Sequence, residues 1–280
     1  MIGFFDSGLG GLSTLKEWLH IAPKSYDFCY LGDQLRTPYG GRNPEAIEKF
    51  TEEGFHFLWK QGAEIIILAC NTSSSEALRN MQKKYPEKKI LGSIIPAVET
   101  ALAKTRFGRI GVIGTRGTIF SGAYEREIQK RHSALCNPKD KRAEKIPKVS
   151  AKATPLLVPL VEENWTSKPE TRMIVRKYLK SLKNHRIDTL ILGCTHYGLM
   201  EKIIRDKIGS RVRIINSGKV QAEKFLDYLN RHLEIEKNLE TNGKRQFFTT
   251  DSVDRFVEVG SQFLGLKIGK NSVEKVTINS

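Results

Sequence analysis

Short apolar runs alternate with amphipathic stretches along the chain. The runs are mostly continuous and rich in β-branched or aromatic residues, as expected of parallel strands buried on both faces. They predict strands at residues 2–6, 27–32, 64–70, 89–95, 109–114, 188–194 and 211–216. The stretches between them predict helices at 12–22, 44–60, 74–84, 171–183 and 199–207, and the tail after about 240 predicts a short strand and then a helix. Strands that alternate with helices indicate an α/β fold.

A weak internal repeat divides the chain into two similar halves. MIGFFDSG at the start resembles RIGVIGTR at 109–116, although short aliphatic strands also look alike by chance. EIIILACNTSS is similar to DTLILGCTHYG at 188–198, and here each cysteine ends a predicted strand and is followed by Thr within two residues. The repeat favours two α/β lobes that face each other.

Polar residues gather where the predicted strands end. Ligands of open α/β sheets bind outside the carboxyl ends of the strands. Such ends carry Asp6-Ser7, Cys70-Asn71-Thr72, Gly114-Thr115 and Cys194-Thr195-His196. If the lobes face each other, these turns would line one cleft. Ser73 and Glu76 have the spacing of a capping box, which predicts a helix start directly after the first of these cysteines.

The two strand-end cysteines, Cys70 and Cys194, are open to more than one interpretation. A single cysteine is most often a small buried hydrophobic residue. CNTS is also a CxxS sequence of the kind that some redox proteins place at a helix N-terminus. His196 would suit a hydrolase, in which a cysteine is paired with a histidine base. Two such thiols, each followed by hydrogen-bonding side chains, favour a functional role.

Three loops carry further candidate groups. FDSGLGG has Ser13 where a dinucleotide-binding G-x-G-x-x-G needs glycine, but its turn beside a helix N-terminus could hold a carboxylate. GDQLRTPYGGRN (32–43) is either a surface loop or a segment that brings Tyr39 and backbone amides over a ligand. ATPLLVPLVEEN (153–164) presents Glu162 and Glu163, which are equally consistent with solvated acids at a helix end.

Composition narrows the class of protein. With 280 residues, 39% hydrophobic and 28% charged, the chain is long enough for one large globular domain or two modest ones. Its apolar runs are too short to span a bilayer, and its start lacks the basic region of a signal peptide, so we expect a cytoplasmic protein without a membrane segment. The four cysteines (29, 70, 136 and 194) form no CxxC pair and match no zinc spacing, so we expect reduced thiols and no metal site.

The net charge of +15 favours anionic partners, either nucleic acid or small carboxylates, or else reflects a lysine-rich solvated surface. The basic clusters at 79–89 and 139–148 contain interleaved acids and few aromatic residues, unlike a platform that stacks bases. Zinc-finger and RNP-type motifs are absent from the sequence. Nucleic-acid binding is therefore not favoured, although the charge alone does not exclude it.

Five motifs in this order carry a family resemblance: FDSGLGG, GDQLRTPYG, ACNTSS, PLVPLVEE and GCTHY. Together they resemble the glutamate racemases, within the cofactor-independent aspartate/glutamate racemases, from residue 3 to about 230. The resemblance implies two pseudo-symmetric, doubly wound α/β lobes with mainly parallel sheets and an active site between them. We expect residues 1–96 with 215–280 in the first lobe, completed by the C-terminal segment, and 97–214 in the second. The family interconverts L- and D-glutamate without pyridoxal phosphate, supplies D-glutamate for bacterial peptidoglycan and commonly forms homodimers.

Racemisation itself calls for two bases, because the α-proton leaves one face of the carbon and a proton returns to the other. Cysteine, with an ordinary pKa of about 8.5, allows one thiolate and one thiol at neutral pH. By resemblance, Cys70 takes the proton from D-glutamate and Cys194 takes it from L-glutamate. Asp6 and His196 match residues beside these two thiols, and Glu162 matches an acid near the substrate ammonium. The matches to substrate-binding positions are Ser7, Tyr39, Gly40, Asn71, Thr72, Thr115, Thr118 and Thr195.

Three positions depart from the family pattern: Ile95, Thr154 and Gly198 stand where many members carry Glu, Cys and Pro. None of them removes a proposed base, but Ile95 and Gly198 could alter the rate, the cleft dynamics or dimer contacts. An aspartate racemase would share the cysteines and hold a shorter substrate. The sequence is also compatible with a cysteine-dependent hydrolase or redox protein, and its charge with a nucleic-acid-binding protein.

Overall fold

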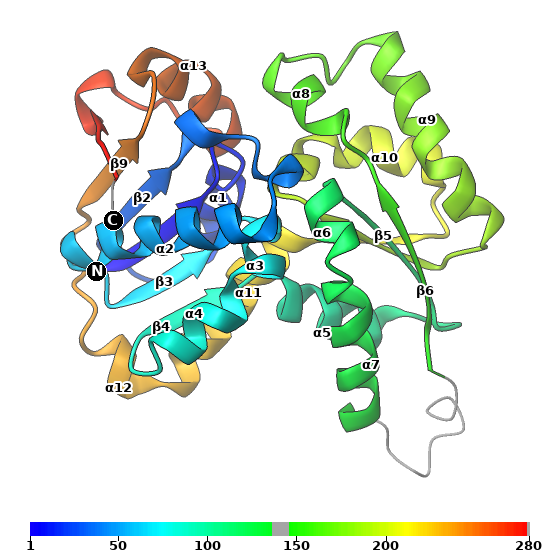
Figure 1. Ribbon diagram of the computed structural model, residues 1–280, viewed down its shortest axis with the longest axis horizontal. Coiled ribbons are helices and arrows are strands. Elements are labelled where there is room, and N and C mark those ends of the chain that lie inside the picture. Colours follow the sequence, from blue (N-terminus) through cyan, green and yellow to red (C-terminus); the bar gives the residue numbers. More distant parts are fainter. Residues whose placement is uncertain (136–145, 279–280) are drawn as a thin grey trace.

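Two parallel β-sheets form the centres of two α/β lobes (Figure 1). The computed structural model describes residues 1–135 and 146–278. The first sheet has the order β10 (Val273–Lys275), β9 (Arg245–Thr249), β2 (Phe28–Gly32), β1 (Ile2–Asp6), β3 (Ile65–Leu68) and β4 (Lys89–Gly92). The second has the order β6 (Lys148–Ala153), β5 (Arg109–Gly114), β7 (Thr189–Gly193) and β8 (Arg213–Asn216). The predicted α/β fold with two mainly parallel sheets is confirmed.

The two sheets share one strand order. The run β2-β1-β3-β4 in the first sheet corresponds to β6-β5-β7-β8 in the second. Strands β1 and β5, which open the two halves, are therefore equivalent, and so are β3 and β7, which precede the two cysteines. In each sheet the opening strand is hydrogen-bonded directly to the strand that leads to a cysteine. The internal repeat in the sequence thus reflects a repeated topology.

Helices cover both faces of the first sheet, which explains its continuous apolar strands. Ile2 and Phe4 pack with α1 (Leu12–Ile21), α11 (Ser217–Arg231) and α13 (Val253–Leu264). Phe5 points to the opposite face and packs with α2 (Pro44–Lys60) and α4 (Leu78–Lys84). Alternate residues of one central strand therefore contribute to two separate apolar layers.

The second sheet is covered in the same way. Val112 and Ile191 pack with α5 (Ile94–Lys104) and α7 (Ala123–Leu135) on one face. Ile113 and Leu192 pack on the other face with α8 (Leu157–Glu162), α9 (Pro169–Asn184) and α10 (Glu201–Ile208). Both lobes are thus three-layered, with a helix layer on each side of a parallel sheet.

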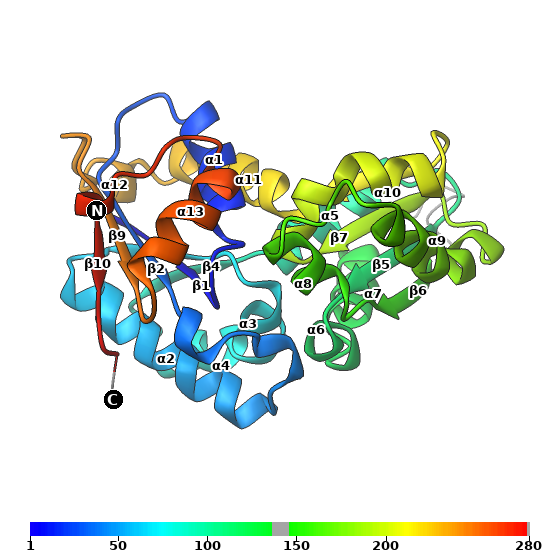
Figure 2. The same ribbon diagram turned by 90° about the horizontal axis from the view of Figure 1, so that it is seen from above.

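Helix α11 connects the two lobes and lies between them in both views (Figures 1 and 2). It contacts α1 of the first lobe and α5 of the second. The ring of Phe225 lies 4.5 Å from that of Trp18, and the Gln221 amide donates to the Leu68 carbonyl at 3.0 Å. This helix therefore anchors the junction of the lobes on an apolar contact and on a bond to the strand that precedes a cysteine.

Short elements fill the remaining connections. The segments α3 (Asn71–Glu76), α6 (Arg116–Phe120) and η3 (Thr195–Met200) follow β3, β5 and β7 almost directly. The others are α12 (Leu233–Glu236), η1 (Gln34–Arg36), η2 (Tyr39–Gly41) and η4 (Lys270–Ser272). Three of the candidate turns are thus the starts of short helical segments at strand ends.

Two sequence predictions were wrong in their boundaries. The strand predicted at 89–95 ends at Gly92, and α5 begins at Ile94, because Ile94, Ala97, Val98 and Ala101 form a buried helical stripe. The helix predicted at 74–84 is two helices, α3 and α4, and the first begins at Asn71. The helix start predicted directly after the cysteine is confirmed, but the capping box was wrong: Cys70 is the N-cap, and its sulfur accepts the Ser73 N–H at 3.5 Å.

Edge strands and several helices were missed. Among the residues that the structure describes, strand β6 (KVSAKA) pairs with β5 alone; it is partly exposed and lacks the apolar run of a central strand. Strand β10 is a three-residue edge strand.

The predicted lobe division falls inside α5 and β8, and β8 pairs with β7 through Asn216. Cys136 and most of the basic cluster at 139–148 lie outside the described residues. Within the described ranges, no helix is long and apolar enough to cross a membrane.

Gly54 of α2 tests how closely the first lobe is packed. A Cβ at this position would lie 2.2 Å from Cε2 of Phe5. Alanine is favoured over glycine in a helix by about 1 kcal/mol, but overpacking a core costs about 1–3 kcal/mol. We expect Gly54→Ala to lower the free energy of unfolding, measured in urea. Lys60→Ala on the exposed end of the same helix should change it by less than about 0.5 kcal/mol. An unchanged or raised stability for Gly54→Ala would contradict this packing.

Candidate active site

The polar turns after β1, β3, β5 and β7 meet between the two lobes. Thr195 of the second lobe donates its hydroxyl to Asp6 of the first at 3.4 Å and accepts the Ser13 hydroxyl at its carbonyl at 2.9 Å. Thr72 lies 2.8 Å from Thr115, measured between hydroxyl oxygens. The carboxyl ends of two facing sheets are therefore in direct contact, and most of the candidate residues lie together.

Cys70 is buried at the end of β3 and begins α3. Its Sγ donates to the Ser7 hydroxyl at 3.4 Å and accepts the N–H of Ser73 at 3.5 Å. Burial and the nearby Asp6 carboxylate raise the pKa of the thiol to about 11, against the opposing effect of the Ser7 and Ser73 contacts. At neutral pH this cysteine is therefore a protonated thiol that can give up a proton.

Cys194, at the end of β7, has different surroundings. Its Sγ lies 3.8 Å from Nδ1 of His196, and the other ring nitrogen of that histidine lies 3.0 Å from Oε1 of Glu162. Arg255 of α13 lies 3.8 Å from the second oxygen of Glu162. A row of four side chains thus runs from the second thiol to the surface of the first lobe.

The charge state of His196 follows from this row. Burial opposes its positive charge, but hydrogen bonds to the Cys194 sulfur and to Glu162 outweigh burial and raise its pKa to about 10. Burial also acts on Glu162, yet the bond to the histidine lowers the pKa of this carboxyl. At neutral pH the ring is therefore protonated, and its positive charge lies beside the Cys194 sulfur.

Asp6 is fully buried and lies near both Cys70 and His196, the residue beside Cys194. It accepts the N–H of Gly8 at 3.0 Å as well as the Thr195 hydroxyl. Burial raises its pKa, while His196 and the hydrogen bonds limit the rise. A buried carboxyl with a raised pKa in contact with groups of both lobes is typical of a functional site.

Three threonine hydroxyls from the two lobes form a cluster. Thr118 lies 3.2 Å from Thr72 and 3.0 Å from Thr115, and Thr115 also caps α6 by accepting the Thr118 N–H at 3.3 Å. A hydroxyl can both donate and accept, so these groups can turn from one another towards an anionic ligand. They are the densest set of candidate donors in the site.

Asn71 and Tyr39 are held by other protein groups. The Asn71 amide accepts the Tyr124 hydroxyl at 2.6 Å and donates to the Ser217 hydroxyl at 3.3 Å. The Tyr39 hydroxyl donates to Asp33, and its buried ring packs 5.6 Å from that of Phe50. Tyr39 therefore supports its loop from within the first lobe.

Two glycines allow the lobes to come close. A Cβ on Gly10 would lie 2.3 Å from the Thr195 hydroxyl oxygen and 2.5 Å from Nδ1 of His196. A Cβ on Gly40 would lie 2.4 Å from Cβ of Thr115. The loop predicted to cap a ligand thus meets the second lobe through the backbone of Gly40. Any side chain at either position would push the lobes apart.

Sequence reasoning missed five residues that shape the site: Ser13, Asp33, Tyr124, Ser217 and Arg255. Four of them act on partners far away in the sequence, as in the bond from Ser13 to Thr195, 182 positions later. Only Asp33 had a usable signal, because it follows β2 as Asp6 ends β1. It is fully buried and accepts bonds from Arg36 at 2.6 Å and Thr250 at 2.9 Å.

The three departures from the family pattern lie outside the contacts of the thiols. The Thr154 hydroxyl is buried and bonds to that of Tyr197 at 2.7 Å. A Cβ on Gly198 would lie 3.1 Å from the amide nitrogen of Asn216. Ile95 lines a separate cavity. Among the described residues, no group of three or more His, Cys, Asp or Glu side chains is arranged to hold a metal ion.

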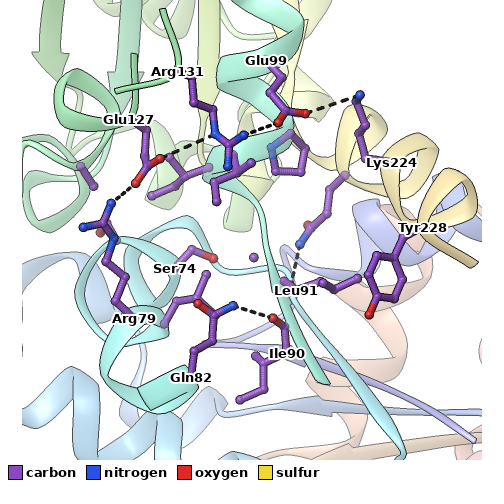
Figure 3. Close-up of a pocket in the computed structure, with 18 of the residues that line it drawn as sticks. Ser74, Arg79, Gln82, Ile90, Leu91, Glu99, Glu127, Arg131, Lys224 and Tyr228 are labelled. Carbon is purple, nitrogen blue, oxygen red and sulfur yellow. Dashed lines mark hydrogen bonds and ion pairs between the residues drawn. The ribbon is translucent and has the colours of Figure 1, made fainter. Parts of the chain in front are cut away.

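That separate cavity, of about 610 Å³, is lined by residues of α4, β4, α5, α7 and α11 (Figure 3). A chain of ion pairs crosses it. Arg79 of α4 pairs with Glu127 of α7, and Arg131 pairs with Glu99 at 2.5 Å. Lys224 of α11 lies 3.5 Å from the same Glu99. Its lining includes neither thiol, so this cavity is a charged joint between the lobes rather than the site of the thiols.

Comparison with known proteins connects this geometry to a family. A family model described as Asp/Glu/Hydantoin racemase matches residues 21–225. The chain is 38% identical to glutamate racemase of Geobacter metallireducens, over 96% of this chain and 94% of that protein. It thus aligns with this relative over almost its full length.

Solved structures agree with this similarity. Glutamate racemase isoform RacE1 from Bacillus anthracis has a TM-score of 0.87 and 34% identity, over 99% of this chain and 97% of that one. Glutamate racemase from Francisella tularensis, in complex with D-glutamate, has a TM-score of 0.85 and 30% identity, again over 99% and 97%. The two-lobe arrangement is therefore shared with these enzymes.

The pair of His196 and Glu162 predicts a pH dependence. The pKa of His196 in the folded protein, about 10, lies above the ordinary value of 6.5. The pairing therefore stabilises the folded protein fully below about pH 6.5, and this stabilisation is lost as the pH rises towards 10. Glu162→Gln should lower the pKa of His196, measured by NMR titration of the labelled imidazole, and shift this loss of stability to lower pH. Glu163→Gln, which changes only the exposed neighbour, should leave that pKa unchanged. Equal titration curves in the wild type and Glu162→Gln would contradict the assignment.

Proposed function

This chain belongs to the Asp/Glu/hydantoin racemase family, and we propose that it interconverts L- and D-glutamate by proton transfer at Cα through Cys70 and Cys194. The observation that carries the proposal is the position of these thiols at the ends of equivalent strands, β3 and β7, whose turns meet between the lobes. The similarity to glutamate racemases over nearly the whole chain supports glutamate as the substrate.

The protonated Cys70 thiol suits one direction of this reaction directly. In the conversion of L-glutamate, the Cys194 thiolate removes the α-proton and becomes a thiol. Cys70, a thiol at neutral pH, delivers its proton to the opposite face of the carbon and becomes a thiolate. One proton leaves and one arrives, so the product is D-glutamate. The reverse reaction begins from the state that this turnover leaves.

Buried acidic side chains and hydroxyl groups each have a role in this scheme. The α-proton of an amino acid is weakly acidic, so the site must stabilise a carbanion-like transition state with preorganised groups. Asp6 would assist at Cys70, and His196, oriented by Glu162, would assist at Cys194. The hydroxyls of Ser7, Thr72, Thr115, Thr118 and Thr195, with Asn71 and the backbone of Gly40, would bind the carboxylates and the amine.

The same family membership supports a proposal for the cellular role. We propose that the protein acts in the cytoplasm, supplies D-glutamate for peptidoglycan and forms a homodimer. Light scattering of the purified protein tests the last point. We expect the mass of a dimer, and the mass of a monomer at all concentrations would contradict the proposed dimer.

The reaction can be tested with purified protein and no added cofactor. We expect the circular dichroism of either pure glutamate enantiomer to decay to zero, with the α-hydrogen replaced by deuterium in D₂O. Aspartate should react far more slowly. Unchanged L- and D-glutamate would overturn the proposal, and faster loss of aspartate optical activity would identify aspartate as the substrate instead.

Each thiol has a separate prediction. Cys70→Ala and Cys194→Ala should each lower kcat for racemisation at least about 10³-fold, because residues that act as a unit are lost together. Cys29→Ala is the matched control, since this third free cysteine is buried in β2, outside the site, and its pKa is raised to about 12 by burial. Its turnover should stay within about threefold of the wild type. Retained racemisation in either thiol variant would contradict a two-thiol mechanism.

Two rival functions have distinct signatures. A cysteine hydrolase or redox protein would form a covalent adduct on a thiol, which mass spectrometry of the protein with substrate would detect. A nucleic-acid-binding protein would bind DNA with strong salt dependence, so absence of binding at low salt would remove that possibility.

A further inference from the structure

One tyrosine contacts the turns of both thiols. Tyr124 of α7 is 1% exposed, and a Cβ on Gly193 would lie 3.0 Å from its ring. Its ring therefore packs against the residue that precedes Cys194. Its hydroxyl donates at 2.6 Å to Asn71, the residue that follows Cys70. A single rigid side chain thus spans from one thiol-bearing turn to the other.

A second arm completes the connection. The Asn71 amide donates to Ser217 at 3.3 Å, and the Ser217 hydroxyl donates to the carbonyl of Leu192 at 2.7 Å. Leu192 and Gly193 are adjacent residues of β7, directly before Cys194. Tyr124 therefore bonds to the oxygen of the Asn71 side chain, and Ser217 bonds to its nitrogen. Both residues also contact the end of β7.

These contacts are placed to resist movement. Tyr124, Asn71 and Ser217 are each at most 2% exposed, so water does not compete for their bonds. Gly193 leaves room for the ring, which a side chain would exclude. A buried network in which every member is bonded is rigid.

We propose that Tyr124 and Ser217 are positioning residues that fix the Cys70 turn relative to the Cys194 strand end by clamping Asn71 between them. Neither touches the reacting atoms in this role. This inference rests on the proposed function. It adds an account of what fixes the distance between the two thiols, which proton transfer to opposite faces of one carbon requires. A misplacement of about 1 Å can cost about 10²-fold in rate, so the clamp acts on turnover.

Tyr124→Phe removes the hydroxyl and keeps the ring on Gly193. We expect kcat to fall about 10–100-fold in both directions, with KM within about threefold of the wild type. Because the enantiomers have equal free energy, kcat/KM must remain equal in the two directions for every variant, so kcat and KM are compared separately. Rates are normalised to the folded fraction, measured by far-UV circular dichroism. An unchanged kcat, or a change confined to KM, would overturn the inference.

Ser217→Ala removes the other arm and should lower kcat in the same way. Because both residues act through Asn71, the double variant should lose less than the product of the two single losses. Losses that multiply would contradict a shared action. If Tyr124→Phe does not fold, Ser217→Ala decides alone, with a lowered kcat supporting the clamp and a normal kcat refuting it.

Tyr26→Phe is the matched control. It also deletes the hydroxyl of a buried tyrosine, but this hydroxyl donates to Glu236 at 2.9 Å in a partly buried contact, away from the thiols. It should keep the kcat and KM of the wild type, and a loss as large as that of Tyr124→Phe would refute a specific effect. Wild-type racemisation tests the proposed function itself, so the two can fail independently.

Discussion

The proposed racemisation requires two proton carriers on opposite sides of one carbon, and the arrangement of the chain meets this geometric constraint. A single parallel sheet presents the ends of its strands along one edge, so it cannot supply groups on both sides of a small ligand. Two sheets of the same strand order, set with their carboxyl ends together, can do so. The repeat of β1 and β3 as β5 and β7 places a cysteine at corresponding ends of both sheets.

The topology is repeated, but the surroundings of the two thiols are not. Cys70 lies beside a buried carboxyl and the start of a helix, whereas Cys194 lies beside a protonated imidazole that Glu162 and Arg255 support. A carboxyl group thus lies nearest to Cys70, and an imidazolium lies nearest to Cys194. In the proposed reaction one cysteine gives a proton while the other takes one, so different surroundings for the two thiols on a symmetric scaffold suit that chemistry.

Much of this arrangement was predictable from the sequence, and the limits have physical causes. Central strands were found because both faces are buried, and the strand-end turns with their thiols followed from that. Edge strand β6 was missed because it pairs on one side only. The cap at Cys70 was missed because a sulfur takes the role usually given to an oxygen. Tyr124 and Ser217 left no local signal, since their partners are 53 and 146 positions away. The proposed roles of the site residues rest on resemblance and on these contacts.

The contact between the lobes is built from small and polar groups, and this has an energetic consequence. Gly10 and Gly40 let backbone approach side chains of the other lobe, while the threonine cluster and the bond from Ser13 join the lobes by hydroxyls. Each such hydrogen bond contributes only about 0.5–1.5 kcal/mol net, because water replaces it when it opens. Helix α11 packs Phe225 against Trp18 of the first lobe and Val220 into the apolar cluster of the second lobe, and these contacts have no such replacement. The lobes are therefore joined firmly along α11 and weakly at the turns. Since Cys70 and Cys194 are only 5% and 7% exposed, separation of the lobes at the turns is the less costly way to expose them.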